Sequence, residues 1–154
     1  MNPDDFTAQV IRPALAAINL GGLAAEQLLL GTALQESGLR NIRQSGGPAL
    51  GYFQMEPATH NDIWTNFLMG KPQLAAAIKN LLPNGTAPLT SDLISFPIYA
   101  AAMARVHYLR VPAPLPAAGD LDAQAAYYKK WYNTPGGAAT TAEYIANWSR
   151  AMVG

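Results

Sequence analysis

The chain has 154 residues, of which half are hydrophobic and 13% are charged, as in a globular protein with the length of one domain. Its ten basic and ten acidic residues cancel, so it lacks the basic excess of a nucleic-acid-binding protein. With no cysteine and only two histidines, it has neither disulfides nor the residues for a thiolate or histidine-rich metal site. We therefore expect a single domain over residues 1–154 that uses no metal and no cofactor.

The N-terminal residues MNPDD have no basic start and lead into no unbroken apolar run, so they do not resemble a signal peptide. No stretch approaches the roughly 18 consecutive apolar residues that span a bilayer. We expect a protein that is made in the cytoplasm and does not insert into a membrane. If its target lies outside the cytoplasm, another system has to release it.

The predicted elements are mainly helical, and the first two lie close together in the chain. The first helix runs from about residue 4 to 18, and Pro13 should bend or split it. The second spans residues 23–37 and ends at Gly38, because glycine adopts the left-handed conformation that closes many helices.

This second helix carries an apolar face that ends in an acidic residue. Ala25, Leu29 and Ala33 repeat at helical spacing, and Glu36 comes next on the same face. A carboxyl group that is partly removed from water keeps its proton to a higher pH, as a general acid must. Glu36 is therefore a candidate proton donor, and the alternative is a helix-end glutamate in solvent or paired with Arg40.

Residues 39–56 contain too many glycines and prolines for a helix and predict a loop or a small β-hairpin. A third helix should begin near Pro57, a favourable first-turn residue, and run to about residue 68. A fourth helix is expected over residues 72–82, before the helix-breaking sequence Pro-Asn-Gly.

The fifth predicted helix spans residues 93–104, with Ser91 or Asp92 as its cap. Ser95 is its only polar residue, which is typical of a helix buried in the middle of a domain. Pro97 comes early enough that we expect a kink and not an end.

The sixth helix should run from about residue 120 to 132, after a stiff connection with three prolines. Thr140 and Glu143 have the spacing of a capping box and predict a seventh helix that ends near Met152. The predicted fold is thus mainly α, with a central buried helix and a small glycine-rich insertion after the helix that carries Glu36.

Three segments resemble the motifs of the soluble lytic transglycosylase and goose-type lysozyme family. Residues 36–39, ESGL, are similar to its Glu-Ser-Gly-apolar motif. Residues 51–59, GYFQMEPAT, match its Gly-Leu-Met-Gln motif at the glycine and the glutamine, and also its following proline and threonine. Residues 131–136, WYNTPG, are similar to its Ala-Tyr-Asn-Ala-Gly motif, except that tryptophan replaces the alanine and an extra residue precedes the glycine.

The resemblance implies a lysozyme-like domain that cleaves the glycan strands of bacterial peptidoglycan. Glu36 would protonate the oxygen that links N-acetylmuramic acid to N-acetylglucosamine and would then act as a base. In lytic transglycosylases the attacking group is the sugar's own 6-hydroxyl, whereas in hydrolases it is water, often positioned by an aspartate. The candidates for a second carboxylate are Glu56 and Asp62, although an acidic residue at a helix start can equally be a capping partner.

The resemblance also implies a set of substrate-binding residues. Tyr132 would orient the Glu36 carboxyl through a hydrogen bond, although its four-residue spacing from Tyr128 also fits ordinary helix packing. Of the two histidines, His60 is the one that we expect to face the cleft. The candidate binding residues are Ser37, Tyr52, Gln54, Tyr132 and Asn133.

Three of these candidates have specific alternatives. Tyr52 and Gln54 would line the cleft and bind the acetamido and hydroxyl groups of the sugars, unless they form an exposed hairpin tip. Ser37 would contact substrate or cap the helix end. Phe53, beside Tyr52, is expected in the core.

A lone glutamate without a clear aspartate favours a lytic transglycosylase, and the first alternative is a hydrolytic muramidase. A second alternative is a module on the same fold that holds glycan, or builds a virion, without cutting. A helical adaptor with coincidental motifs is the third. The single-domain form suggests a monomeric phage endolysin or virion-carried lysin that acts on the bacterial cell wall, and a bacterial enzyme exported by a specialised system would look the same.

Overall fold

The computed structural model describes residues 1–133 and 136–153, and within them the chain is helical and contains no β-strand. Short π-helical or 3-10 turns, η1 to η4, connect or extend several of the α-helices. In chain order the elements are α1 (Pro3–Phe6), η1 (Thr7–Ile11), α2 (Arg12–Ala17), α3 (Leu23–Ser37), α4 (Pro57–Asn66), η2 (Leu68–Gly70), α5 (Pro72–Lys79), η3 (Pro83–Gly85), α6 (Asp92–Ser95), α7 (Pro97–Leu109), α8 (Leu121–Tyr128), η4 (Lys129–Asn133) and α9 (Thr141–Val153).

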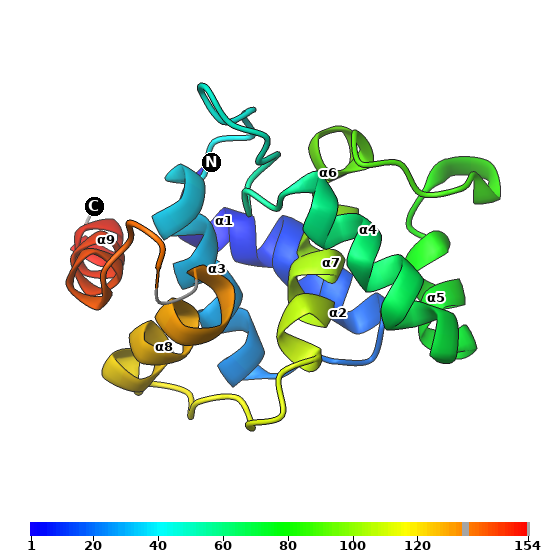
Figure 1. Ribbon diagram of the computed structural model, residues 1–154. Coiled ribbons are helices and arrows are strands. Elements are labelled where there is room, and N and C mark those ends of the chain that lie inside the picture. Colours follow the sequence, from blue (N-terminus) through cyan, green and yellow to red (C-terminus); the bar gives the residue numbers. More distant parts are fainter. Residues whose placement is uncertain (134–135, 154) are drawn as a thin grey trace.

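Helix α7 lies at the centre of the domain, between α3 on one side and α4 and α5 on the other (Figure 1). Every residue from Tyr99 to Val106 is buried, so the prediction of a central buried helix is confirmed. Helices α8 and α9 pack on α3, and α8 also meets α7, where the rings of Tyr127 and Tyr108 have centroids 5.6 Å apart. The hydroxyl of Tyr144 on α9 occupies the space that a side chain at Gly31 would need, which lets α9 approach α3 closely.

The expected kink at Pro97 is wrong, because the chain breaks there into two helices. Helix α6 ends at Ser95, Phe96 has φ −130° and ψ 89°, and α7 begins at Pro97. Proline disfavours the helical conformation of the residue before it and is well suited to the first turn of a new helix. The Asp92 carboxylate accepts a hydrogen bond from the Leu89 amide at 2.8 Å and so closes the turn before α6.

The first predicted helix continues without interruption from Pro3 to Ala17, but its hydrogen-bond pattern changes before Pro13, which the sequence predicts to bend or split it. Helix α1 passes into the π-helical turn η1, and α2 starts at Arg12. Proline lacks an N–H and its ring crowds the preceding turn, so a wider turn accommodates it. Phe6, just before this turn, and Ile11, its last residue, are both fully buried, which holds this helix against the core.

Helix α3 has the predicted bounds, and Gly38 closes it with φ 62° and an N–H bonded to the Leu34 carbonyl at 3.1 Å. Among the other elements, α5 ends at Lys79, earlier than predicted, and the sixth predicted helix changes at Lys129 from α8 to the π-helical turn η4. The capping box before α9 is confirmed, because the Glu143 amide donates to Thr140 Oγ1 at 3.1 Å.

The segment between α3 and α4 is a loop with isolated bridges and not a regular hairpin. Leu50 pairs with both Arg43 and Met55, and the Leu50 amide donates to the Met55 carbonyl at 3.0 Å. Asn41 Nδ2 donates to the Ile94 carbonyl at 2.8 Å and ties the loop to α6. This loop, residues 39–56, is called the insertion loop below.

Gly51 fixes the insertion loop against α6. It has φ 80°, and a Cβ at this position would collide with the Leu93 carbonyl oxygen. We expect Gly51→Ala to lower the free energy of unfolding by about 3 kcal/mol, because left-handed strain and a backbone clash add. Gly46→Ala, at φ 73° in open space, should cost only about 1 kcal/mol. Denaturant titration of both variants tests this, and equal losses would contradict the clash.

Candidate active site

A cleft with a volume of about 730 Å³ lies among the end of α3, the insertion loop, the start of α4, the end of α7 and η4. Its walls are mostly polar, which suits a ligand rich in hydroxyl and amide groups. The residues that line it are Glu36, Ile42, Gln44, Ser45, Ala49, Gln54, Met55, Glu56, Thr59, His107, Tyr132, Asn133, Gly136 and Gly137.

Glu36 reaches this cleft from the last turn of α3. The face that precedes it, Ala25, Leu29 and Ala33, is buried in the core as predicted. Burial of the carboxyl group raises the pKa of Glu36 above its ordinary value, and a hydrogen bond from Tyr128 offsets only part of that rise. Glu36 therefore combines contact with the cleft and a raised pKa, the two properties that a general acid needs.

The tyrosine that bonds Glu36 is Tyr128 and not Tyr132, which corrects the prediction from the sequence. The Tyr128 hydroxyl donates to Glu36 Oε2, and its ring is fully buried on α8. Burial and, secondly, the negative charge of Glu36 raise the pKa of Tyr128, so the phenol keeps its proton and remains a donor. Tyr132 lies one turn further along and donates to the Phe53 carbonyl at 2.6 Å while lining the cleft.

Two of the predicted binding residues, Ser37 and Tyr52, do not line the cleft. Ser37 Oγ lies 3.1 Å from the Ala33 carbonyl oxygen and 2.7 Å from that of Tyr52, so it joins the end of α3 to the insertion loop. The Tyr52 ring packs on Phe6, with ring centroids 4.8 Å apart. Both residues hold the loop in place, and Phe53 is in the core as expected.

Gln54 and Asn133 line the cleft, as predicted. Gln54 has φ 48°, and its Nε2 donates to the carbonyls of Ile42 and Gly51 at 2.9 Å each, which stiffens one wall. On the other wall, Asn133 Oδ1 accepts a hydrogen bond from Lys129 Nζ at 2.9 Å.

Lys129 was not identified from the sequence, yet it organises the far rim of the cleft. Its Nζ also donates to the Gly137 carbonyl at 2.9 Å, so one ammonium group bridges η4 and the residues beyond it. The only signal in the sequence is the four-residue spacing of Lys129 and Asn133 on a helix. Residues 134 and 135, within the third motif, lie outside the described part of the chain.

Of the two candidate second carboxylates, only Glu56 lines the cleft, at the residue before α4. Asp62 does not line the cleft, so it is not the second carboxylate that the sequence suggested. Its carboxylate accepts hydrogen bonds from Asn66 Nδ2 at 2.5 Å and from Arg110 Nη1 at 2.7 Å. These two bonds, the one from Asn66 first, lower the pKa of Asp62, so it stays ionised as the partner of Arg110.

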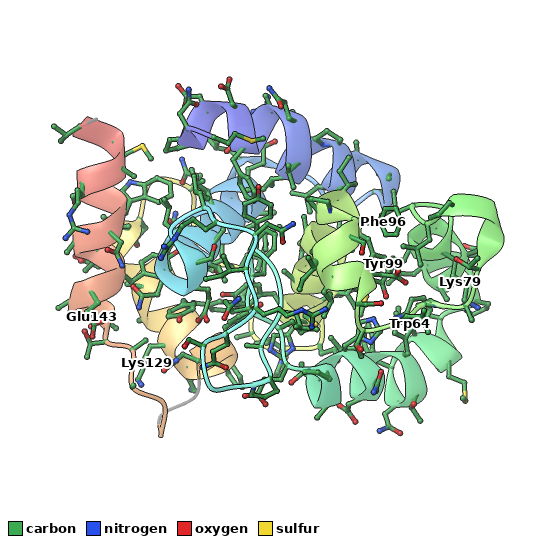
Figure 2. All side chains as sticks on the ribbon, turned by 90° about the horizontal axis from the view of Figure 1, so that it is seen from above. Trp64, Lys79, Phe96, Tyr99, Lys129 and Glu143 are labelled. Carbon is green, nitrogen blue, oxygen red and sulfur yellow. The ribbon has the colours of Figure 1, made fainter. Side chains whose placement is uncertain are left out.

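The prediction that His60 faces the cleft is also wrong, because His107 lines the cleft and His60 does not. His60 is buried, with Nε2 at 2.7 Å from the Tyr99 hydroxyl and Nδ1 at 3.0 Å from Asn61 Oδ1. Trp64 Nε1 donates to the same Tyr99 hydroxyl at 2.9 Å, where α4 meets α7 (Figure 2). His60 thus belongs to the contact between these helices.

No group of three or more histidine, aspartate or glutamate side chains that could hold a metal ion occurs among the described residues. Within that same part of the chain, no helix is both long and apolar enough to cross a bilayer. Comparison with protein-family models, curated proteins and solved structures found no match. The function is therefore inferred from the side chains of the cleft.

Proposed function

We propose that the chain is a lysozyme-like enzyme that degrades peptidoglycan by cleaving the β-1,4 bond between N-acetylmuramic acid and N-acetylglucosamine. The single observation that carries this proposal is Glu36, a carboxyl with a raised pKa that opens to a polar cleft. The cleft's volume of about 730 Å³ lies in the range of sites that enclose small ligands. The three motif resemblances supply the class of glycan.

In this proposal Glu36 gives its proton to the bridging oxygen of the glycan and so makes it a better leaving group. Because Tyr128 holds Oε2, the other carboxyl oxygen, Oε1, carries the transferred proton. The same carboxylate then accepts a proton from the group that attacks the sugar. The buried phenol prevents rotation of the carboxyl during both steps.

The attacking group decides between two related activities. We propose a lytic transglycosylase, in which the 6-hydroxyl of the muramic acid attacks and leaves a 1,6-anhydro end. This route needs no second carboxylate, and Asp62 is already engaged by Arg110. Hydrolysis by a muramidase is the alternative, and the position of Glu56 on the cleft wall is the observation that favours it.

Digestion of purified peptidoglycan in ¹⁸O-labelled water distinguishes these routes. We expect anhydro ends without ¹⁸O. Mass spectrometry detects them because these fragments are lighter by one water than the corresponding products of hydrolysis. Glu56→Gln should keep the rate within about threefold of the parent, because its carboxylate takes no part in transglycosylation. Reducing ends that carry ¹⁸O, together with a large loss of rate in Glu56→Gln, would replace the transglycosylase by a muramidase.

A further inference from the structure

His107, on the last turns of α7, lines the cleft that contains Glu36. Its ring meets the Tyr132 ring edge to face, with centroids 5.0 Å apart and planes at 77°. This contact and the central position of α7 fix where the imidazole lies. The mechanism proposed above makes no use of this residue.

The partner of His107 determines which ring nitrogen carries the proton. Arg110 Nη2 lies 3.0 Å from His107 Nδ1. A guanidinium group has only donors, so Nδ1 must be the acceptor, and in the neutral ring the proton is on Nε2. Asp62 accepts from Arg110 Nη1 at 2.7 Å and thereby holds the guanidinium in this orientation.

The surroundings also keep the imidazole neutral. Burial and, secondly, the charge of Arg110 lower the pKa of His107 to about 4, and Asp62 opposes them only in part. Glu36 and Glu56 are the acidic residues of the same cleft. At neutral pH His107 is therefore an uncharged donor.

The donor is accessible to solvent, on a residue that lines the cleft. His107 Nε2 makes no hydrogen bond with the residues that the structure describes, and none of their buried side-chain nitrogen or oxygen atoms lacks a partner. Nε2 is therefore reached by solvent, and the cleft is the surface that His107 lines. An oriented N–H without a protein partner, in a site with a general acid, is available to a ligand.

We propose that His107 is a specificity-determining residue, whose Nε2–H donates a hydrogen bond to the acetamido carbonyl oxygen of an N-acetylated sugar. This inference rests on the proposed function, because it concerns the same cleft. An uncharged donor suits a neutral carbonyl oxygen, which only accepts hydrogen bonds. The cation beside His107, Arg110, is already paired with Asp62, so this part of the cleft does not favour a carboxylate ligand. Asp62 and Arg110 are then positioning residues for His107.

Binding of defined glycans to the Glu36→Gln variant tests the inference without any cutting. The probes are an oligomer of N-acetylglucosamine and its de-N-acetylated form of the same length. We expect Glu36→Gln to bind the acetylated oligomer more tightly, and the added change His107→Leu to reduce that preference about five- to tenfold. His107→Gln, which keeps an N–H near the position of Nε2, should retain most of the preference. Because His107 is neutral, His107→Leu and His107→Gln do not alter the charge of the cleft. The amine charge of the second probe therefore affects all these proteins equally, since they share the Glu36→Gln background.

Nitrogen NMR of the imidazole gives a second readout that does not depend on a ligand. We expect the Nε2–H tautomer for His107 in the parent protein, and a mixture of tautomers in Arg110→Gln, where the partner of Nδ1 is lost. A proton on Nδ1 in the parent, an acetyl preference that survives His107→Leu, or no binding of either oligomer would each overturn the inference. Failure of the proposed function would appear separately, as a parent protein that leaves peptidoglycan intact.

Discussion

Replacing Glu36 by glutamine is expected to lower the rate of peptidoglycan cleavage on the order of 10³-fold or more. Glutamine has nearly the same shape and can still accept the hydrogen bond from Tyr128, but it has no proton to give to the bridging oxygen. The rate is measured as the release of dye from labelled cell walls. The fold should persist, since the change removes a carboxyl that is costly to ionise in its buried position.

Glu26→Gln is the matched control, because Glu26 lies on the same helix and is paired with Arg12 at 2.9 Å. This variant changes the same functional group away from the cleft and should keep the parent's rate. A Glu36→Gln protein with an unchanged melting temperature that lyses cell walls as fast as the parent would show that Glu36 is not the residue that transfers the proton.

Tyr128→Phe is expected to move the alkaline limb of the pH profile of kcat/KM to higher pH by about one unit, and to lower kcat about tenfold. The tyrosine hydroxyl favours the ionised form of Glu36, so its removal raises the pKa of Glu36 further. The acid form that starts the reaction then persists to higher pH. Phenylalanine fills the same buried space, so the lower kcat follows from the lost orientation of the carboxyl and not from a cavity.

Tyr132→Phe provides the comparison, because this hydroxyl donates to the Phe53 carbonyl and not to Glu36. It should leave the alkaline limb where the parent has it, even if substrate binding weakens. Rates measured across the pH range for both variants test the assignment. A limb that stays fixed in Tyr128→Phe would contradict the role of Tyr128, and a limb that moves only in Tyr132→Phe would return the orienting role to Tyr132.

The features that the sequence predicted correctly are those that neighbouring residues determine. The bounds of α3 follow from helical periodicity and from a glycine at the end, and both signals are local. The burial of α7 follows from its composition, and the capping box of α9 from the spacing of Thr140 and Glu143. The position of Glu36 on the cleft agrees with its local pattern, an apolar helical face that ends in an acidic residue.

The predictions that failed depend on contacts between residues far apart in the chain. Tyr128 and Tyr132 lie four residues apart on one helical face, so the sequence does not show which of them bonds Glu36. The docking of α8 on α3 decides this. Tyr52 packs on Phe6 and does not line the cleft, which is again a contact between residues far apart in the chain. Asp62 pairs with Arg110, which follows the end of α7, so the neighbours of Asp62 in sequence gave no indication of its role.

The break at Pro97 was a different kind of error, because its signal is local. Both the restriction that proline places on Phe96 and its preference for a first turn favour a break. The apolar run across residues 93–104 suggested one continuous helix, although Phe96 leaves the helical conformation. The break does not disturb the burial of α7, which is why the central helix was still predicted.

Mass spectrometry of purified peptidoglycan digested by the parent protein and, in parallel, by Glu36→Gln tests the central claim most directly. We predict that the parent releases fragments whose new ends lie at N-acetylmuramic acid on one side and N-acetylglucosamine on the other. The Glu36→Gln sample should contain no such fragments above the untreated control. Peptidoglycan left uncut by the parent, or cut equally by both proteins, would contradict the assignment of Glu36 as the residue that transfers the proton.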